Sequence, residues 1–316
     1  IPFLFHSYSI PIPFLFHSYS IPIPFRFFPM SSTAHKSASR FEDWQPRTSE
    51  ADLRSTKPSP IRLDHFDPDA RPFSTGDKAI DRAALEALAE NINSLQELLY
   101  ASKSHKVLVV LQGLDAAGKD GTLRGVFSRT SPLGVRTVGW KAPSDLERTH
   151  DYLWRIHAAM PHDGEIMLFN RSHYEDVLVP VVDHQIDDRT TRQRYAQIND
   201  FERMLTENGT VIIKCMLLIS KDEQRQRLQA RIDDPTKNWK FNVDDLETRK
   251  HWDDYMAAYA ALLGATSTPW APWTIVPANS KTHRNLMIAT LVRDVLQSLG
   301  LHYPPAIPEL RNLHID

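Results

Sequence analysis

The stretch that decides the fold is VLVVLQGLDAAGKDGT, residues 107–122. Its first part, 107–112, is a run of branched apolar side chains that is typical of a buried parallel strand. A turn bounded by Gly113 and Gly118 follows, and Lys119 closes it before a helix-like segment. Glycine lets backbone N–H groups approach a ligand, and the start of a helix adds partial positive charge. The order strand, glycine turn and helix therefore predicts a loop that binds phosphate.

Two carboxylates distinguish this loop from the common P-loop. The common loop ends in Gly-Lys-Ser or Gly-Lys-Thr, whose hydroxyl binds Mg²⁺, whereas Asp120 follows Lys119 here. Because bare carboxylates would repel an anion, Asp115 and Asp120 indicate a bound Mg²⁺ or Mn²⁺, and Asp115 is the stronger candidate. Asp120 either replaces the hydroxyl or simply favours the start of the helix. The other loop residues predicted to contact phosphate or nucleotide are Gly113, Ala116, Ala117, Gly118, Gly121 and Thr122.

A second polar cluster follows a buried strand in EIMLFNRSHYED, residues 165–176. Asn170 stands where the facing strand of P-loop enzymes usually ends in Asp. Arg171 is predicted to pair with a phosphate, and Glu175 or Asp176 to hold metal or to orient the arginine. The alternative is that Arg171 and Glu175 form an ordinary i,i+4 pair on a surface helix.

A third cluster, RQRLQARIDDPTKNWKF at 225–241, carries basic side chains on a helix that breaks at a proline. In small phosphoryl-transfer kinases a basic lid of this kind closes over the phosphates and excludes water. Arg231, Lys237 and Lys240 are the predicted phosphate ligands, and Arg227 shares the helical face of Arg231. The interleaved aspartates allow a second interpretation, a solvated pair of mixed-charge helices. Lys141, after another strand, is a weaker candidate for contact with an acceptor phosphate.

Strand and helix patterns alternate along the chain. The predicted strands are residues 107–112, 134–140, 165–170, 211–219 and 274–276. The predicted helices are residues 79–102, 119–129, 146–159, 190–207, 221–232, 243–263 and 281–299. Apolar strands that alternate with helices predict an α/β domain whose parallel sheet is covered on both faces. Its ligand would lie at the carboxyl ends of the strands, where the first two clusters fall.

Composition excludes several classes of protein. The 316 residues include 37 basic and 39 acidic side chains, for a net charge of −2. No field of the whole molecule therefore attracts nucleic acid or a membrane surface, and we expect neither as a partner. The single cysteine, Cys215, excludes an internal disulfide and fits the reducing cytoplasm. Because Cys215 lies in an apolar run, a buried and inert thiol is expected.

The two ends of the chain lack the strand and helix patterns of its central part. IPFLFHSYSIP at residues 1–11 recurs unchanged at 12–22, and the first methionine is Met30. The unit is too short for a solenoid repeat, lacks the basic start of a signal peptide, and contains no run of about 18 apolar residues that could span a membrane. Our hypothesis is that residues 1–29 are a disordered, translated upstream repeat. Residues 30–74 are predicted to be an extended arm that adds nothing to the core, and 304–316 a surface tail.

Four segments together resemble the polyphosphate kinase 2 family. They are GLDAAGKDGT at 113–122, FNRSHYEDVLV at 169–179, LQARIDDPTKNWKF at 228–241 and DLETRKHWDDYMAAY at 245–259. The resemblance covers residues 75–303, and it accounts for the Asp after the loop Lys and the Asn after the facing strand. It implies a P-loop kinase, a three-layer sandwich with a parallel five-stranded sheet and a helical lid at about 221–263.

The resemblance also implies roles for individual residues. In that family the loop Asp and the carboxylates of the second motif are associated with Mg²⁺, here Asp115 and Asp176. The loop Lys, the Arg after the facing strand and the basic lid residues contact phosphate chains. Carried over, the catalytic set is Asp115, Lys119, Arg171, Glu175 and Asp176. The phosphate-binding set includes Asn170, Arg231, Lys237 and Lys240.

The activity implied is magnesium-dependent, reversible phosphoryl transfer between inorganic polyphosphate and AMP, ADP or ATP, with guanine nucleotides as further candidates. The wording of the motifs is most similar to members that act on both AMP and ADP, and the family implies a homotetramer. One alternative is a thymidylate-kinase-type enzyme with ATP as donor, which shares GxDxxGK but not Asp120 or the larger basic lid. Another is a nucleotide-dependent binding switch, for which the sequence contains no recognition loop or interaction repeat.

Overall fold

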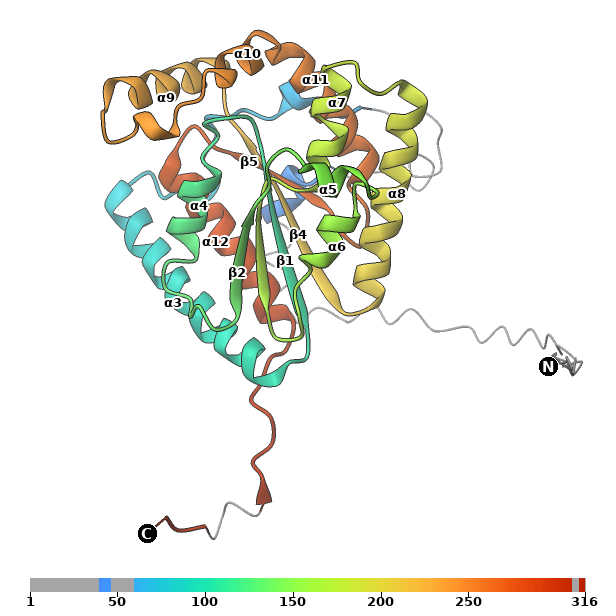
Figure 1. The fold of residues 1–316 in the computed structure, drawn as a ribbon. Helices are drawn as coiled ribbons and strands as arrows, with labels where there is room; N and C mark the ends of the chain where they lie inside the picture. The colour runs from blue at the N-terminus through green and yellow to red at the C-terminus, as the bar shows by residue number, and fades with distance from the viewer. Residues whose placement is uncertain (1–39, 47–59, 309–312, 316) are drawn as a thin grey trace, which may run out of the picture.

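Five apolar runs form one parallel sheet in the computed structural model, which describes residues 40–46, 60–308 and 313–315 (Figure 1). The strands are β1 (Lys106–Gln112), β2 (Val135–Gly139), β3 (Ile166–Asn170), β4 (Thr210–Leu218) and β5 (Trp273–Pro277). Their order is β2-β3-β1-β4-β5, and each neighbouring pair runs parallel. Branched side chains suit a strand that is buried on both faces, so β1, β3, β4 and β5 are almost wholly enclosed. The predicted parallel five-stranded sheet is confirmed.

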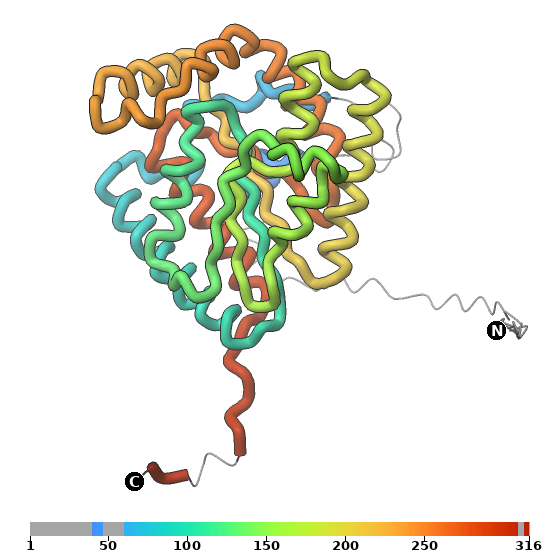
Figure 2. Tube along the Cα trace, in the orientation of Figure 1, coloured from blue at the N-terminus to red at the C-terminus, as the bar shows by residue number. Residues whose placement is uncertain are grey.

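Helices cover both faces of the sheet, which gives three layers (Figures 1 and 2). One face is covered by α3 (Lys78–Ser102), α4 (Lys119–Val126) and α12 (Lys281–Ser298). The other is covered by α7 (Val179–Val182), α8 (Asp188–Glu207) and α11 (Trp252–Thr266). The helix after β1 lies on one face and those after β3 on the other, so a crevice opens between the carboxyl ends of these two paired strands. This crevice is where the first two sequence clusters meet.

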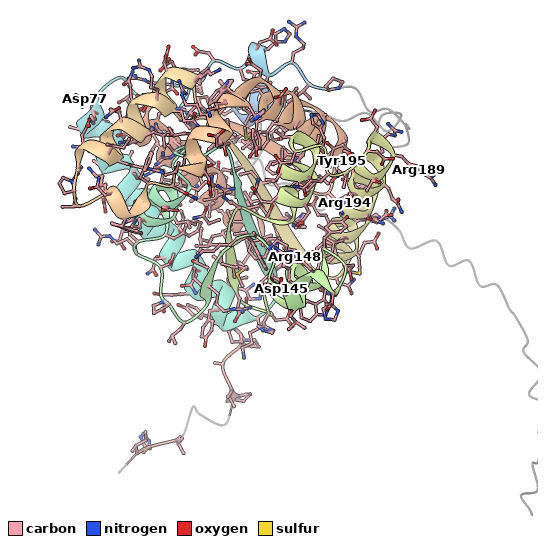
Figure 3. The ribbon with its side chains drawn as sticks, turned by 45° about the horizontal axis from the view of Figure 1, so that its top comes forward. Asp77, Asp145, Arg148, Arg189, Arg194 and Tyr195 are labelled. Carbon is pink, nitrogen blue, oxygen red and sulfur yellow. The ribbon has the colours of Figure 1, made fainter. Side chains whose placement is uncertain are left out.

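Two predicted helices are in fact interrupted. The helix expected at 146–159 is two short ones, α5 (Asp145–Arg148) and α6 (Trp154–Ala158). A capping box at Ser144 begins α5, and the Asp151 carboxylate accepts the backbone N–H of Leu153 and so starts a new turn. Arg148 pairs with Asp145 at 2.8 Å across one turn of α5 (Figure 3).

The helix expected at 243–263 also breaks, at His251. Its two parts are α10 (Asp244–Lys250) and α11, and the backbone of His251 between them has left the helical region. With α9 (Lys221–Asp233) and the 3₁₀ turn η4 (Asn238–Lys240), α10 lies across the carboxyl end of the sheet (Figure 1). Because α11 packs on α8 beneath them, the break allows α10 to turn over the crevice.

The described part of the N-terminal arm corrects one prediction. The arm was expected to add nothing to the core, yet Phe41, Leu63 and Phe73 are buried in it, and Phe41 packs on Phe73 at 4.7 Å. Two short 3₁₀ turns, η1 (Glu42–Trp44) and η2 (Leu63–His65), shape this segment. Its apolar residues follow no period, so the sequence pattern could not reveal them. The repeat at 1–22, Met30 and the rest of the arm lie outside the described residues.

Candidate active site

The phosphate-binding loop joins β1 to α4 through two glycines with positive φ. At Gly113 (φ 145°) a side chain would place a Cβ atom 2.7 Å from the carbonyl oxygen of Leu217 on β4. Only glycine lets the two backbones approach so closely. At Gly118 (φ 107°) the chain turns into α4 in a conformation that favours glycine. The predicted turn is therefore present, and it begins where β1 ends.

Lys119 is buried beneath this loop. Its Nζ donates to the carbonyl oxygens of Gly113 at 2.5 Å and Leu114 at 3.3 Å. Burial, and then the positive charge of Arg171, lower the pKa of Lys119 to about 8. The cation is thus held at the centre of the loop by weak neutral acceptors, which an incoming phosphate can replace.

Arg171 is fixed by two carboxylates. It is the first residue after β3, and its φ of 66° is unusual for a side chain other than glycine. Its guanidinium donates to Asp115 and, at 3.0 Å, to Glu175. Burial alone would lower the pKa of Arg171, but the charges of Glu175 and Asp115 raise it instead. Strained backbone of this kind clusters at functional sites, where it aims a side chain.

Gln112, the last residue of β1, forms hydrogen bonds that hold Glu175 and the segment after β3 in place. Its Nε2 donates to Glu175 at 2.9 Å, and its Oε1 accepts from the Ser172 hydroxyl at 3.3 Å. The i,i+4 pair that the sequence allowed as a surface feature is therefore present, but it is half-buried and connected to the loop through Asp115.

The two residues that depart from the common P-loop contact one another. Asn170 at the end of β3 donates its side-chain N–H to Asp120 at 2.7 Å. The carboxylate at the start of α4 is thereby linked to the neighbouring strand. The two residues that differ from the common P-loop, Asp120 and Asn170, are therefore bonded to each other within the site.

A cavity of about 520 Å³ lies between the loop, the segment after β3 and the lid helices. It is lined on one side by Asp115, Arg171 and Glu175, and on the other by Asp244, Asp245 and Glu247 of α10. Tyr255 and Tyr259 of α11 line it as well. Burial, and then the charge of Asp115, raise the pKa of Asp245. So many carboxylates around one arginine favour a cation or hydroxyl groups at this end of the site.

Asp176 and Lys141 do not line this cavity. Asp176 is partly buried, its Oδ2 lies 3.7 Å from Arg155, and burial raises its pKa. Arg194 on α8 donates to the backbone oxygen of Asp176 at 2.7 Å. Arg155 on α6 donates to the Lys141 carbonyl at 2.9 Å, while the Lys141 side chain is exposed. The structure thus places Asp176 and Asp115 in separate clusters.

The predicted lid bases lie on α9 and the turn after it. Arg231 donates to Asp245 at 3.1 Å and to the Lys240 carbonyl at 3.2 Å. Lys237 pairs with Asp234 at 2.5 Å, and Lys240 lies over the exposed ring of Trp239 at 5.0 Å. Arg231 and Lys237 pair with acids of the same segment, as the mixed-charge interpretation expects. The segment lies over the carboxyl end of the sheet (Figure 1), and contact of its bases with phosphate stays a prediction.

Sequence reasoning missed several residues that the structure brings to the site. Tyr259, Asp183 and Asp245 line the cavity, and Arg284 packs behind the loop. Arg284 falls in the first turn of the helix after β5, so its place at the carboxyl edge of the sheet was the one available signal. Asp245, Tyr255 and Tyr259 belong to the motif quoted at 245–259, but no pattern in the sequence indicated which of its side chains face the cavity.

A divalent metal fits the donors that are present. Among the described residues, no group of three or more His, Cys, Asp or Glu side chains is arranged to hold a metal. Mg²⁺ needs fewer, because it keeps several waters and takes one or two carboxylates together with substrate phosphates. Asp115 and Glu175 supply hard oxygen donors on the cavity wall.

Comparisons with known proteins agree with this geometry. The family model for polyphosphate kinase 2 matches residues 75–301. The AMP/ADP-polyphosphate phosphotransferase of Meiothermus ruber is 50% identical over 247 residues, 77% of this chain and 91% of that protein. The ADP-polyphosphate phosphotransferase of Rhodopseudomonas palustris is 43% identical over 239 residues, 72% of this chain and 83% of that protein.

The solved structures give the same answer. The crystal structure of polyphosphate kinase 2 from Arthrobacter aurescens TC1 superposes with a TM-score of 0.79 at 40% identity, covering 87% of this chain and 93% of that one. The predicted P-loop kinase fold and the predicted resemblance are both confirmed. The chain belongs to the polyphosphate kinase 2 family.

Proposed function

We propose that this protein catalyses reversible, magnesium-dependent phosphoryl transfer between inorganic polyphosphate and adenine nucleotides, with both AMP and ADP as acceptors. The observation that carries the proposal is the similarity to the Meiothermus ruber enzyme, whose name gives both acceptors, over nearly the whole folded part of the chain. The linked pair Asp120 and Asn170 supports it, because the same two positions set the chain apart from the common P-loop.

The charges of the site suit such a transfer. Phosphoryl transfer needs little covalent assistance, so catalysis consists mainly of positioning and of neutralising charge. Lys119 and Arg171 flank Asp115 and present two cations to the transferring group. Arg171 is already oriented by its carboxylates, so little of its conformational freedom remains to be lost on binding. Arg231, Lys237 and Lys240 would add charge as the lid excludes water.

Magnesium would neutralise phosphate charge at the carboxylate side of the cavity when bound. We propose Asp115 as its protein ligand, with Mn²⁺ as a substitute. Glu175 is a better second candidate than Asp176, because Glu175 shares the cavity with Asp115 whereas Asp176 faces Arg155.

A kinase of the thymidylate-kinase type, with ATP as donor, is not favoured. Relatives at 50% and 43% identity are named polyphosphate phosphotransferases. No described helix is both long and apolar enough to cross a bilayer. We further propose that the protein is a cytoplasmic homotetramer. Multi-angle light scattering would measure its mass in solution.

A panel of donors and acceptors tests the function. Polyphosphate or ATP would be offered with AMP, ADP, GMP or GDP, with Mg²⁺ present or removed by a chelator, and nucleotide products separated by chromatography. We expect ADP and ATP from AMP with polyphosphate as donor, and none without the metal. Turnover with ATP and AMP but not with polyphosphate would contradict the proposal.

A further inference from the structure

Two arginines, Arg284 buried and Arg227 partly buried, donate hydrogen bonds to carbonyl oxygens of the phosphate-binding loop. Arg227, on the first lid helix α9, is 9% exposed and donates through Nη1 to the carbonyl oxygens of Ala116 and Ala117, each at 2.9 Å. Arg284, in the first turn of α12, is 3% exposed and donates to the same Ala117 oxygen at 3.3 Å. Segments more than 100 residues away in sequence therefore grip one peptide group from two sides.

Arg227 is connected further. Its Nη2 donates to the carbonyl oxygens of Ala278 at 2.6 Å and Asn279 at 2.8 Å, in the turn between β5 and α12. Its Nε donates to Glu223 at 2.6 Å. One guanidinium thus joins the lid helix, the phosphate loop and the turn before α12. Lysine, with a single donor atom, could not reproduce five such bonds in a plane.

Glycines of α4 make room for Arg284 and its neighbour. A Cβ on Gly118 would lie 1.9 Å from Nη1 of Arg284, and one on Gly121 would lie 3.1 Å from Nη2. A Cβ on Gly125 would lie 2.1 Å from the amide nitrogen of Asn285, whose Oδ1 accepts from Arg284 at 2.9 Å. Glycine weakens a helix interior, so its repeated use here indicates that close packing of this guanidinium is needed.

The charge of Arg284 has no local compensation. No carboxylate among the described residues forms an ion pair with it, and the charged groups that interact with it, Arg227 and Lys281, are both cations. Burial, and then the positive charge of Arg227, lower the pKa of Arg284 to about 9, so it is still a cation at neutral pH. A buried cation of this kind is unfavourable unless a neighbouring anion offsets it. The phosphate loop is the adjacent place for such an anion.

The hydrogen bonds from Arg227 and Arg284 to the Ala117 carbonyl also fix the direction of the next amide, the N–H of Gly118. A trans peptide is planar, so its N–H points opposite to its carbonyl. With the Ala117 carbonyl turned to the two guanidinium groups, the N–H of Gly118 is directed away from them. Preorganised amides of this kind stabilise phosphate charge because no reorganisation is needed when the ligand binds.

We propose that Arg227 and Arg284 are positioning residues that clamp the Ala116 and Ala117 carbonyls and so preorganise the phosphate-binding loop for an oligophosphate. They act through the loop and do not touch the substrate. Because Arg227 belongs to the lid helix, the clamp also links the lid to the loop. The inference rests on the proposed function only in taking a phosphate chain as the ligand.

The test uses the full chain with Arg227→Met and Arg284→Met, and with Arg225→Met on α9 and Arg293→Met on α12 as matched controls. Hydrogen exchange of the peptide that spans 113–120 reports loop order, and calorimetry with inorganic tripolyphosphate reports anion affinity. We expect each clamp variant to exchange loop amides about tenfold faster or more and to bind tripolyphosphate about tenfold more weakly or more, with β4 amides unchanged and the controls within about twofold.

Conservative variants separate positioning from charge and guard against failure to fold. Arg284→Lys keeps the cation, so we expect tripolyphosphate affinity to recover in part while loop exchange stays fast; the same holds for Arg227→Lys. Unchanged loop exchange in the Met variants, or in the Lys variants if the Met variants do not fold, would overturn the proposal. An equal rise in exchange throughout the sheet would do so as well. Loop exchange is measured without turnover, so lack of polyphosphate-dependent activity in the wild type would refute the function and leave the clamp standing.

Discussion

Lys119 and Arg171, the two cations that we propose to bind phosphate, are held in opposite ways. Arg171 is paired with two carboxylates and keeps its charge at any accessible pH, whereas Lys119 is buried against carbonyl oxygens and is close to losing its proton. The two cations therefore respond differently to pH and to substitution, and that difference can be measured.

Replacing Lys119 removes the central cation of the loop. We expect Lys119→Ala to lower kcat by roughly 10²–10⁴-fold, the range typical of a lost electrostatic contact to the transition state. Steady-state kinetics with polyphosphate and ADP would measure it, with the exposed Lys78→Ala as control. Near-wild-type turnover would remove Lys119 from the mechanism.

The pH dependence of phosphate binding follows from the lowered pKa of Lys119. Below its pKa of about 8 the free protein carries the cation, and above it the side chain is neutral. Affinity for tripolyphosphate should therefore be full below this pH and fall as pH rises through it. Calorimetry across this range would show the fall in the wild type, and Lys119→Arg should abolish it because arginine stays charged. An identical fall in the arginine variant would assign the effect to another group.

At the scale of elements, the site depends on the joint between α4 and β3. Asp120 begins the helix, Asn170 ends the strand, and one hydrogen bond of 2.7 Å connects them. Arg231 and Asp245 join the two lid helices α9 and α10 to each other, and Arg227 joins α9 to the phosphate loop. The elements themselves follow from local sequence, but the joints determine whether loop, strand end and lid face one another.

A double-mutant cycle tests the first joint. Asp120→Ala and Asn170→Ala should each lower kcat/KM, but the double variant should lose less than the sum, with a coupling of about 0.5–3 kcal/mol. The ion pair between Arg136 on β2 and Glu165, which lies just before β3 at the end opposite Asn170, is the control and should leave kcat/KM nearly unchanged. Strict additivity for Asp120 and Asn170 would show that the two departures act independently.

At the scale of the whole molecule, a buried ionic network ties the site to the core. Lys214 on β4 donates to Glu202 of α8 at 2.6 Å, to the Tyr174 hydroxyl at 2.8 Å and to the Thr266 carbonyl at 2.9 Å. Tyr174 follows Arg171 by three residues, so this network anchors the segment after β3. A lysine within an otherwise apolar strand was the signal in the sequence, although its partners could not be read there.

Removing one charge of the Lys214–Glu202 pair should lower the free energy of unfolding more than removing both charges. Lys214→Met removes the buried cation opposite Glu202, whose carboxylate keeps the Tyr174 hydroxyl at 2.7 Å and His173 at 3.4 Å. This variant should destabilise the fold by about 3–5 kcal/mol, whereas adding Glu202→Gln should recover part of the loss. Urea unfolding would measure both. Lys106→Met, which breaks an exposed pair with Asp163, should cost about 1 kcal/mol or less. A double variant with a lower free energy of unfolding than Lys214→Met alone would contradict this account.

The sequence by itself determined the parallel sheet, the phosphate loop, the Arg171 cluster and the family, because each is written in a contiguous run whose period or motif is local. Only the tertiary structure decided that Asp120 meets Asn170, that Asp176 turns to Arg155, that Arg227 and Arg284 hold the loop, and that Phe41 and Phe73 enter the core. Each of these is a contact between segments far apart in the chain. Such contacts depend on how helices pack on the two faces of the sheet, and no local pattern in the sequence records that packing.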